Sequence, residues 1–278
     1  MSKIKFAIVG SGRIGRRHAS MVKINKDAEL VAMVDTDESL KVDLESEFSV
    51  PFYTTTKELY EKHPEIDVVN ICTPNFLHAQ QAIEGLNMNC HVVVEKPMAL
   101  NKTDAEKVIY TSLQVNKRVF CVMQNRYSPP AQWLKQVVGS NLLGDIYMVN
   151  INCFWNRDAG YYNHGDANYW KGKLEQDGGT LFTQFSHFLD TMYWLFGDIS
   201  NIKASFYDFN HQETTEFEDS GIVQFDFVNG GAGSINYSTS VYGQNMESSI
   251  SIIGEKGSVK VGGQYMNEIV YCHIENYQ

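Results

Sequence analysis

The chain has 278 residues, 43% of them apolar, which is enough for a buried core in one large domain or two modest ones, and we expect two. A formal net charge of -10 argues against nucleic acid or an anionic membrane as partner, although a local basic cluster can still bind an anionic small molecule. The first apolar run is too short for a signal peptide or a membrane span, which predicts a cytoplasmic protein.

From residue 4 to about 122, short β-branched apolar runs alternate with longer amphipathic stretches. This pattern is typical of a doubly wound parallel sheet covered by helices on both faces, so residues 1–123 are predicted to form an α/β, Rossmann-like domain. The predicted strands are Ile4–Val9, Leu30–Val34, Val68–Ile71, Cys90–Val94 and Val119–Val122. The predicted helices are Ile14–Val22, Glu38–Glu47, Phe76–Leu86 and Thr103–Gln114, the last with its N-cap at the Thr-Asp pair that opens it.

The pattern changes after Pro129-Pro130, and residues 124–278 are predicted to form an α+β domain with a mostly antiparallel open sheet. A helix, Ala131–Val138, precedes a long strand, Ile146–Trp155, and an irregular aromatic stretch to Asp177. Later apolar runs are separated by turn signals such as Asn-Gly-Gly and predict an antiparallel meander. Its expected strands are Ile202–Tyr207, Gly221–Phe227, Gly233–Ser240, Ser248–Ile253 and Gly257–Val261.

The five cysteines form no close pair, and four lie in apolar runs that are predicted to be strands. We expect small core residues in a reducing compartment, with neither disulfides nor a metal site.

The hexapeptide Gly10-Ser11-Gly12-Arg13-Ile14-Gly15 follows a predicted strand and opens a predicted helix. In this context the first glycine makes a tight turn, the second lets the backbone approach a pyrophosphate, and the third lets helix and strand pack closely. Asp35 ends the next strand, where a carboxylate can accept hydrogen bonds from both ribose hydroxyls and would repel a 2'-phosphate. These residues predict NAD, with NADP less favoured; the alternative is a glycine-rich turn with a solvated aspartate.

Two further polar segments follow predicted strands, Thr73-Pro74-Asn75 with His78, and Glu95-Lys96-Pro97. The carboxyl ends of parallel strands form the ligand crevice of such a sheet. A lysine there, beside a cationic nicotinamide, would have its ammonium form disfavoured and could exchange a proton with a substrate hydroxyl. The alternative is a solvated lysine at a strand end.

Over its whole length the chain resembles the glucose-fructose oxidoreductase, inositol dehydrogenase and rhizopine-catabolism family, Gfo/Idh/MocA, in the order of these motifs. The resemblance implies that Lys96 lies close to the nicotinamide and the reacting carbon. It implies a cofactor site made of Gly10, Gly12, Arg13, Ile14, Gly15, Asp35, Thr73, Pro74, Asn75, His78, Glu95, Lys96 and Gln124.

A second family landmark is an aspartate four residues before a histidine that acts on the reacting hydroxyl. Here His187 matches the histidine, but Thr183 stands where the aspartate is expected. A neutral hydroxyl does not stabilise an imidazolium as a carboxylate does, so the alternative for His187 is a structural histidine in an apolar helix.

Sugar-nucleotide 3-dehydrogenases within the family often carry a neutral residue at that position, and the chain resembles them in further segments around Arg126, Arg157, Tyr161 and Trp170. Arg126, Arg157, Lys171 and Lys173 could bind a diphosphate while aromatic rings stack on base or sugar; the alternative is a subunit interface rich in the same residues. The resulting substrate-site prediction contains Lys96, Arg126, Trp155, Arg157, Tyr162, Trp170, Thr183, Gln184 and His187.

The resemblance therefore predicts an NAD-dependent enzyme that oxidises a sugar hydroxyl, best at C3 of a UDP-linked N-acetylhexosamine or its uronic acid, with Lys96 and His187 handling the proton. Rival hypotheses are a dehydrogenase of a free cyclitol or monosaccharide and a non-catalytic dinucleotide-sensing regulator. Family members usually continue into another strand and helix beyond the meander, whereas this sequence stops at Gln278. The alternatives are a C-terminally truncated chain and a protein that lacks part of the usual subunit and interdomain contact. A homodimer or homotetramer is also expected, because an antiparallel sheet with one open face has to cover its apolar side and the resemblance implies that such sheets pair between subunits.

Overall fold

The computed structural model describes residues 2–163, 169–263 and 266–277, and the chain forms two compact units. The first unit comprises the residues up to Val122 together with a short separate segment, Glu175–Asp177. The second comprises Met123–Leu174 and the residues from Gly178 onward. Among the described residues, no helix combines the length and the apolar character that a membrane crossing requires.

The first unit is built on a six-stranded parallel sheet with the strand order β3-β2-β1-β4-β5-β6. This order belongs to the doubly wound dinucleotide-binding fold and confirms the predicted α/β class. The strands are β1 (Ile4–Val9), β2 (Ala28–Val34), β3 (Phe52–Tyr53), β4 (Val68–Ile71), β5 (His91–Val94) and β6 (Val119–Cys121).

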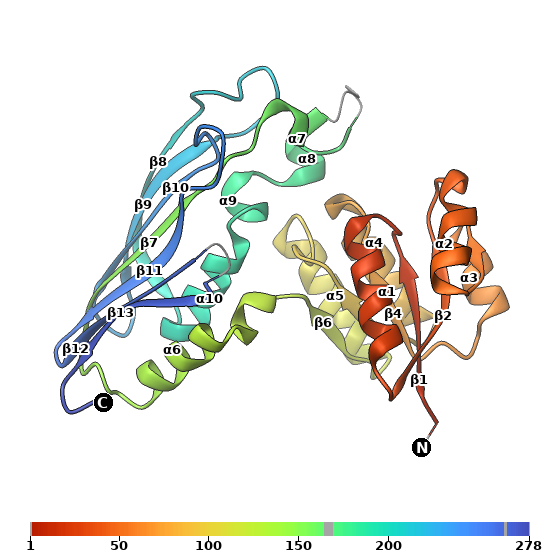
Figure 1. Ribbon diagram of the computed structural model, residues 1–278, viewed down its shortest axis with the longest axis horizontal. Coiled ribbons are helices and arrows are strands. Elements are labelled where there is room, and N and C mark those ends of the chain that lie inside the picture. The colour runs from red at the N-terminus through yellow and green to blue at the C-terminus, as the bar shows by residue number, and fades with distance from the viewer. Residues whose placement is uncertain (1, 164–168, 264–265, 278) are drawn as a thin grey trace. The chain divides into compact units, whose positions relative to one another are not determined.

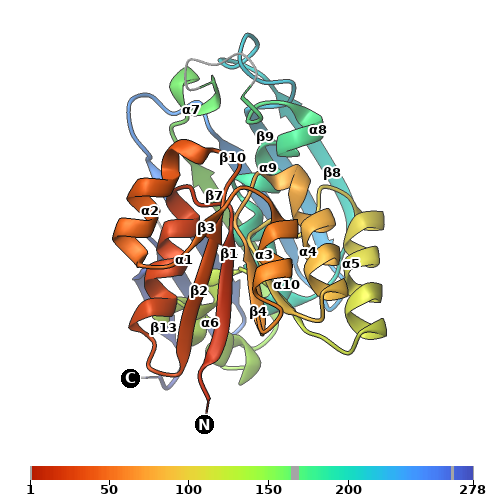
Figure 2. The same cartoon turned by 90° about the vertical axis from the view of Figure 1, so that its right-hand side faces the viewer.

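Helices cover both faces of this sheet because successive side chains of each strand point to opposite sides. Ile8 packs in one core cluster with residues of α1 and α2, whereas Ala7 and Val9 pack in another with residues of α3, α4 and α5. Figure 2 shows α1 and α2 on one side of the strands and α4 and α5 on the other. The helices are α1 (Arg13–Ile24), α2 (Lys41–Phe48), α3 (Thr56–Lys62), α4 (His78–Asn87) and α5 (Lys102–Gln114), with short 3-10 turns η1 (Glu38–Leu40) and η2 (Asn75–Leu77).

Three local features of the first unit differ from the sequence prediction. β3 and α3 were not predicted, since a two-residue strand and a seven-residue helix carry too little periodicity to be recognised. The N-cap of α5 is Asn101, whose side chain accepts a hydrogen bond from the Asp104 main-chain N–H at 2.9 Å, and not the Thr-Asp pair.

The cysteines are free, and three of them, Cys72, Cys90 and Cys153, are buried as expected. Cys121 is half-buried, but Cys272 is exposed, so its assignment to the core was wrong. Burial raises the pKa of the Cys90 thiol to about 11, which keeps it in the unreactive thiol form.

The second unit contains a seven-stranded sheet with the order β13-β12-β11-β7-β10-β9-β8. The predicted simple meander is wrong in one respect, because β7 lies between β10 and β11, parallel to the former and antiparallel to the latter. The alternation of apolar and polar residues along a strand indicates which side of that strand is buried. It does not indicate which other strand pairs with it. The strands are β7 (Ile146–Phe154), β8 (Ile199–Tyr207), β9 (Ser220–Phe227), β10 (Ala232–Ser238), β11 (Glu247–Gly254), β12 (Gly257–Gly262) and the unpredicted β13 (Glu268–Ile274).

Two helices, α6 (Pro129–Gly139) and α10 (Ser186–Phe196), cover one face of this sheet (Figure 1). Leu134 of α6 and Phe188 of α10 belong to the same buried cluster as Ile151 and Ile235 of the central strands. Shorter helical segments complete the unit: η3 (Gln124–Tyr127), α7 (Ala159–Asn163), α8 (Leu174–Asp177, which ends within the separate segment of the first unit) and α9 (Thr180–Thr183).

The opposite face of the central strands is polar, not apolar as expected. Asn150 donates to the Ser234 hydroxyl at 2.6 Å, and Asn236 donates to the side-chain oxygen of Asn152 at 3.1 Å. These side chains alternate with the buried residues of β7 and β10, and exposed apolar residues such as Met148 and Ile222 flank them. The expected dimer or tetramer stays a prediction, but the need to cover a wholly apolar face does not support it.

The glycines of the first βα turn give a direct test of this packing. A Cβ at Gly15 would lie 1.9 Å from the Gly10 carbonyl oxygen, whereas a Cβ at Gly12 would have no heavy atom within 4 Å. We expect Gly15→Ala to lower the free energy of unfolding by about 1–3 kcal/mol through overpacking. Gly12→Ala, the matched control, should change it by less than about 0.5 kcal/mol. Urea denaturation checks both, and equal losses would contradict the packing argument.

Candidate functional site

The glycine loop between β1 and α1 has the shape that a bound dinucleotide requires. Gly10 has a φ of +89°, and a Cβ there would lie 2.6 Å from the carbonyl carbon of Cys72 at the end of β4. The space around Gly12 is open, α1 begins immediately after it, and the first turn of α1 carries no acidic residue. The main-chain N–H groups of this helix end can therefore hold a pyrophosphate.

Asp35 is fixed beside this loop. One carboxylate oxygen accepts the Ser11 main-chain N–H at 2.7 Å, and the other accepts the Asp37 N–H at 3.1 Å. The Ser11 hydroxyl in turn donates to the Val34 carbonyl at 3.0 Å, so strand end and loop are joined twice. The predicted ribose-binding carboxylate is thus held next to the predicted pyrophosphate site, and the residues present fit a dinucleotide.

Glu95, directly after β5, is held by a buried chain of side chains that the sequence did not reveal. Asn70 of β4 donates to Nδ1 of His18 at 3.0 Å, and Nε2 of His18 lies 3.1 Å from a Glu95 carboxylate oxygen. Burial alone would raise the pKa of Glu95, but the hydrogen bond from His18 and the Lys96 N–H outweigh it and hold the pKa below its ordinary value. The one sequence feature that could have pointed to His18 is its position three residues after the last motif glycine, in the helix that follows the glycine loop.

Lys96 follows Glu95 at the carboxyl end of β5 and is half-buried. Its main-chain N–H donates to the second Glu95 carboxylate oxygen at 3.2 Å. The fixed glutamate therefore also fixes the backbone from which the lysine extends.

The Thr73-Pro74-Asn75 segment is anchored by its own side chains. The Thr73 hydroxyl donates to Gln81 at 2.6 Å, and the Asn75 amide donates to the Asp177 carbonyl at 2.9 Å. The ring nitrogens of buried His78 lie 2.8 Å from the Thr73 carbonyl and 2.7 Å from the Pro97 carbonyl. Burial lowers the pKa of His78, whereas the two carbonyls act in the opposite direction, and the ring lies between the two strand-end segments.

In the second unit, the residues around Arg157 form an aromatic-basic cluster, which we define as Trp155, Arg157, Tyr161, Lys171 and Gln184. The guanidinium carbon of Arg157 lies 4.8 Å from the centre of the Trp155 ring and 4.9 Å from that of Tyr161. The Lys171 ammonium lies 3.9 Å from the same Tyr161 ring. Gln184 accepts from Arg157 Nε at 2.9 Å and donates to the Tyr161 hydroxyl at 2.8 Å.

Arg157 and Lys171 are the two cations of this cluster. Within residues 2–163, 169–263 and 266–277, neither Arg157 nor Lys171 forms an ion pair with a carboxylate. Two cations on one ring repel each other, and an anion is the ligand that relieves the repulsion.

Arg126 differs from Arg157 although the sequence grouped them together. Its guanidinium forms a bidentate ion pair with Asp190, with Nε 2.6 Å from one carboxylate oxygen, and lies 5.6 Å from the centre of the Trp194 ring. The charge of Arg126 is therefore already balanced. Gln124, which was predicted to contact the cofactor, is exposed.

The remaining predicted substrate residues lie close to helices α9 and α10. His187 is buried in the first turn of α10. The Thr183 hydroxyl donates to the Gly179 carbonyl at 2.9 Å, a main-chain bond that an aspartate could not make. Tyr162 is buried beneath the cluster with its ring 5.1 Å from that of Tyr161, and Trp170 is half-buried, 6.0 Å from the Tyr169 ring.

Several solved and curated proteins are similar to this chain. A WlbA dehydrogenase from Bordetella pertussis, solved in complex with NADH and UDP-GlcNAcA, is 34% identical, with a TM-score of 0.93 over 100% of this chain and 79% of that chain. D-glucoside 3-dehydrogenase of Escherichia coli is 27% identical over 70% of this chain and 55% of its own length. Myo-inositol 2-dehydrogenase of Thermotoga maritima is 25% identical over 92% and 74%.

This chain spans between 50% and 74% of the length of eight curated relatives that it matches. Residues 4–123 match a family model described as an oxidoreductase family with an NAD-binding Rossmann fold. Residues 131–260 match the GFO/IDH/MocA C-terminal domain. The chain therefore belongs to the GFO/IDH/MocA oxidoreductase family, as the order of its motifs predicts.

Proposed function

We propose that the protein is an NAD-dependent dehydrogenase that oxidises a hydroxyl of a nucleotide-linked sugar, at C3 of a UDP-linked N-acetylhexosamine or its uronic acid. The observation that carries the proposal is the aromatic-basic cluster, in which Arg157 and Lys171 lie against aromatic rings and, among the described residues, form no ion pair with a carboxylate. Such a surface suits a diphosphate joined to flat or ring-shaped groups. The similarity to a dehydrogenase that binds UDP-GlcNAcA supports the same ligand class.

In this proposal the first unit holds NAD through the open backbone at Gly12, the N-terminus of α1 and the carboxylate of Asp35. When bound, NAD supplies the hydride acceptor for the carbon whose hydroxyl is oxidised. The carboxylate of Asp35 selects against a 2'-phosphate by repulsion.

Lys96 is proposed to take the proton that the hydroxyl loses as the carbonyl forms. Lys96 is half-buried at the carboxyl end of β5, and the Glu95 carboxylate fixes the main chain that carries it. Glu95 is kept ionised by His18, so it cannot itself compete as the proton donor.

His187 is proposed to contact the reacting sugar, with Thr183 at the position where the family resemblance leads us to expect an aspartate. The hydroxyl of Thr183 is used by the Gly179 carbonyl, so it does not supply the charge that an aspartate would. We therefore assign the main proton transfer to Lys96 and a polar contact to His187. Arg126, which Asp190 neutralises, is proposed to support the nearby backbone and not to bind the diphosphate directly.

A second candidate is oxidation of a free cyclitol or monosaccharide. The similarity to myo-inositol 2-dehydrogenase and D-glucoside 3-dehydrogenase favours it, because neither name includes a nucleotide. In that case the charges of Arg157 and Lys171 would serve the structure or an interface.

Substrate profiling separates the two candidates. With NAD present, we expect NADH absorbance to appear with UDP-N-acetylglucosamine or its uronic acid and not with glucose or myo-inositol. Arg157→Gln should raise the KM for the nucleotide sugar about tenfold or more, because a charge-assisted contact to phosphate is lost. The control is Arg118→Gln, which replaces an exposed arginine of the first unit and should leave this KM unchanged. Turnover of inositol, unaffected by Arg157→Gln, would establish the second candidate.

Lys96→Met tests the proton transfer. The variant should lower kcat by about 10²–10⁴, the usual contribution of a general base, while the Kd for NAD measured by fluorescence titration stays within about twofold. Lys102→Met removes an exposed lysine whose side chain is 87% accessible and should leave both quantities unchanged. Undiminished turnover by Lys96→Met would refute the assigned role.

Asp35→Asn tests cofactor selection. Loss of the negative charge should weaken NAD binding and lower the ratio of the NADP and NAD Michaelis constants by about tenfold, since the repulsion of a 2'-phosphate disappears. Steady-state kinetics with both cofactors measures the ratio. An unchanged ratio would mean that another group determines the preference.

A further inference from the structure

A buried histidine-aspartate pair lies in the second unit, in the segment that joins β8 to β9. His211 is 2% exposed and Asp219, just before β9, is 1% exposed. A buried charge is costly unless it is paired and hydrogen-bonded, so a pair placed this deeply needs a physical explanation.

Asp219 is surrounded by donors. Its Oδ2 accepts the main-chain N–H groups of Phe209 at 2.9 Å and Asn210 at 2.7 Å, and its Oδ1 accepts the Ser220 hydroxyl at 2.7 Å. Burial would raise the pKa of Asp219, but the hydrogen bonds from Ser220, Ser240 and Asn210 outweigh it and hold the pKa below its usual range. The group is therefore a carboxylate, and it can act as a fixed acceptor.

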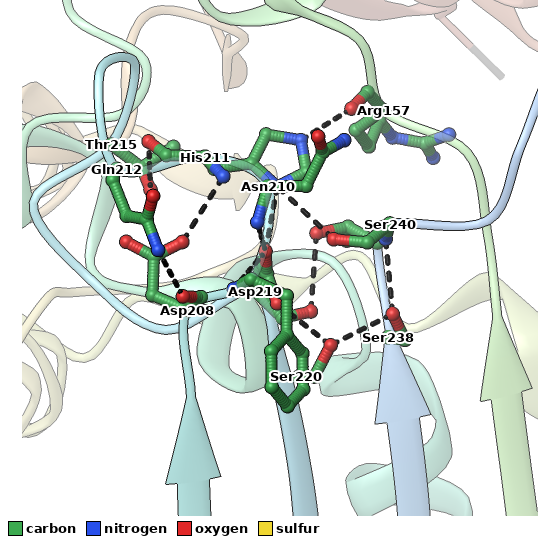
Figure 3. A network of polar contacts seen from close by, with 12 residues as sticks. Arg157, Asp208, Asn210, His211, Gln212, Thr215, Asp219, Ser220, Ser238 and Ser240 are labelled. Carbon is green, nitrogen blue, oxygen red and sulfur yellow. Dashed lines mark hydrogen bonds and ion pairs between the residues drawn. The ribbon is translucent and has the colours of Figure 1, made fainter.

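His211 connects this carboxylate to the main chain of Arg157. Its Nδ1 lies 3.1 Å from Asp219 Oδ2, and its Nε2 lies 2.6 Å from the Arg157 carbonyl oxygen. The Tyr162 ring contacts the imidazole edge-on, with 5.3 Å between ring centres. Figure 3 shows the ring between Asp219 and the Arg157 carbonyl, with the Arg157 guanidinium pointing away from it.

The main chain of Arg157 is thereby held on both sides although the residue lies beyond the end of β7. Its N–H donates to the Thr239 carbonyl at 2.8 Å, and its carbonyl accepts from His211. From this fixed backbone the side chain reaches Trp155, Tyr161 and Gln184. A displacement of the carbonyl would move the guanidinium away from the two rings that flank it.

The same side chains invite a second interpretation, because Asp208, His211 and Asp219 offer ligand atoms within 4.8 Å of one another, as a metal site would. The hydrogen bonds account for these atoms without an ion. Both ring nitrogens of His211 are engaged by protein oxygens, and a carboxylate oxygen of Asp208 accepts the His211 main-chain N–H at 3.1 Å. The geometry is that of a support for Arg157.

We propose that His211, held by Asp219, is a positioning residue that presents the Arg157 guanidinium to the anionic group of the substrate. The proposal rests on the proposed function for the identity of that group, a sugar-linked diphosphate. It predicts that the affinity for the nucleotide part depends on His211, whose ring contacts Arg157 at its main-chain carbonyl. A change of His211 should leave the KM for NAD, which binds to the first unit, unaltered.

A double-mutant cycle tests this coupling. The Kd for UDP is measured by calorimetry for the wild type, His211→Gln, Arg157→Gln and the double variant, alongside kcat and the KM values for nucleotide sugar and NAD. We expect each single change to weaken UDP binding and raise the sugar KM by about tenfold, with little change in kcat or in the NAD KM. The double variant should bind UDP no more weakly than Arg157→Gln alone. Additive losses would overturn the proposal.

Controls separate this role from a loss of folding. His273→Gln changes an exposed histidine of β13 and should have no effect. If His211→Gln melts far below the wild type, Ser240→Ala replaces it in the cycle, because the Ser240 hydroxyl lies 3.3 Å from His211 Nδ1 and its loss disturbs the ring more gently. Ser240→Ala should then weaken UDP binding less than Arg157→Gln does. Combined with Arg157→Gln, it should add no further loss of UDP binding.

A spectroscopic measurement tests the inference even if the substrate class is wrong. In an ¹H–¹⁵N spectrum, the Arg157 Nε–H signal can be assigned by its loss in Arg157→Gln. Its hydrogen bond to Gln184 should make it sensitive to the backbone, so His211→Gln should shift or broaden it and His273→Gln should not. An unmoved signal would refute the positioning role, whereas a moved signal with no UDP binding by the wild type would refute only the proposed function.

Discussion

The close approach of α1 to the ends of β1 and β4 is the contact on which the cofactor half of the molecule depends. This close approach is possible because Gly10 and Gly15 have no side chain. A Cβ at Gly10 would meet backbone atoms of Cys72, and a Cβ at Gly15 would meet backbone atoms of Gly10. This packing leaves the helix N-terminus uncovered beside Gly12 and brings Ser11 within hydrogen-bond distance of Asp35. The absence of two side chains thus brings together the helix dipole, the N–H groups of the helix end and the Asp35 carboxylate, which we propose binds the ribose.

The strand ends of the same unit show how the main chain that carries Lys96 is held in place. Glu95 is tied to α1 through His18 and to β4 through Asn70, while His78 joins the loops that follow β4 and β5. These contacts are buried or part-buried, and they are costly to break because the separated groups would remain unsatisfied. Lys96 extends from this framework.

In the second unit the feature that distinguishes the candidate site is the arrangement of its positive charges. A chain with an overall net charge of -10 keeps two cations, Arg157 and Lys171, on the faces of aromatic rings without a carboxylate partner in the described part of the chain. Arg126, by contrast, is neutralised by Asp190. The difference between these arginines decides which of them can recruit an anion, and the Asp219–His211 pair explains how Arg157 is held in place.

The sequence by itself determined the α/β order of the first unit, the glycine loop, Asp35 and the strand-end position of Lys96, because hydrophobic periodicity and turn glycines act locally. It also determined the family. Only the tertiary structure decided that β7 enters the second sheet between β10 and β11, that the outer face of the central strands is polar, and that Arg126 and Arg157 differ. His18, His211 and Asp219 remained hidden for the same reason. Their partners lie 77, 54 and 8 residues away along the chain, and burial and pairing depend on contacts that no local pattern encodes.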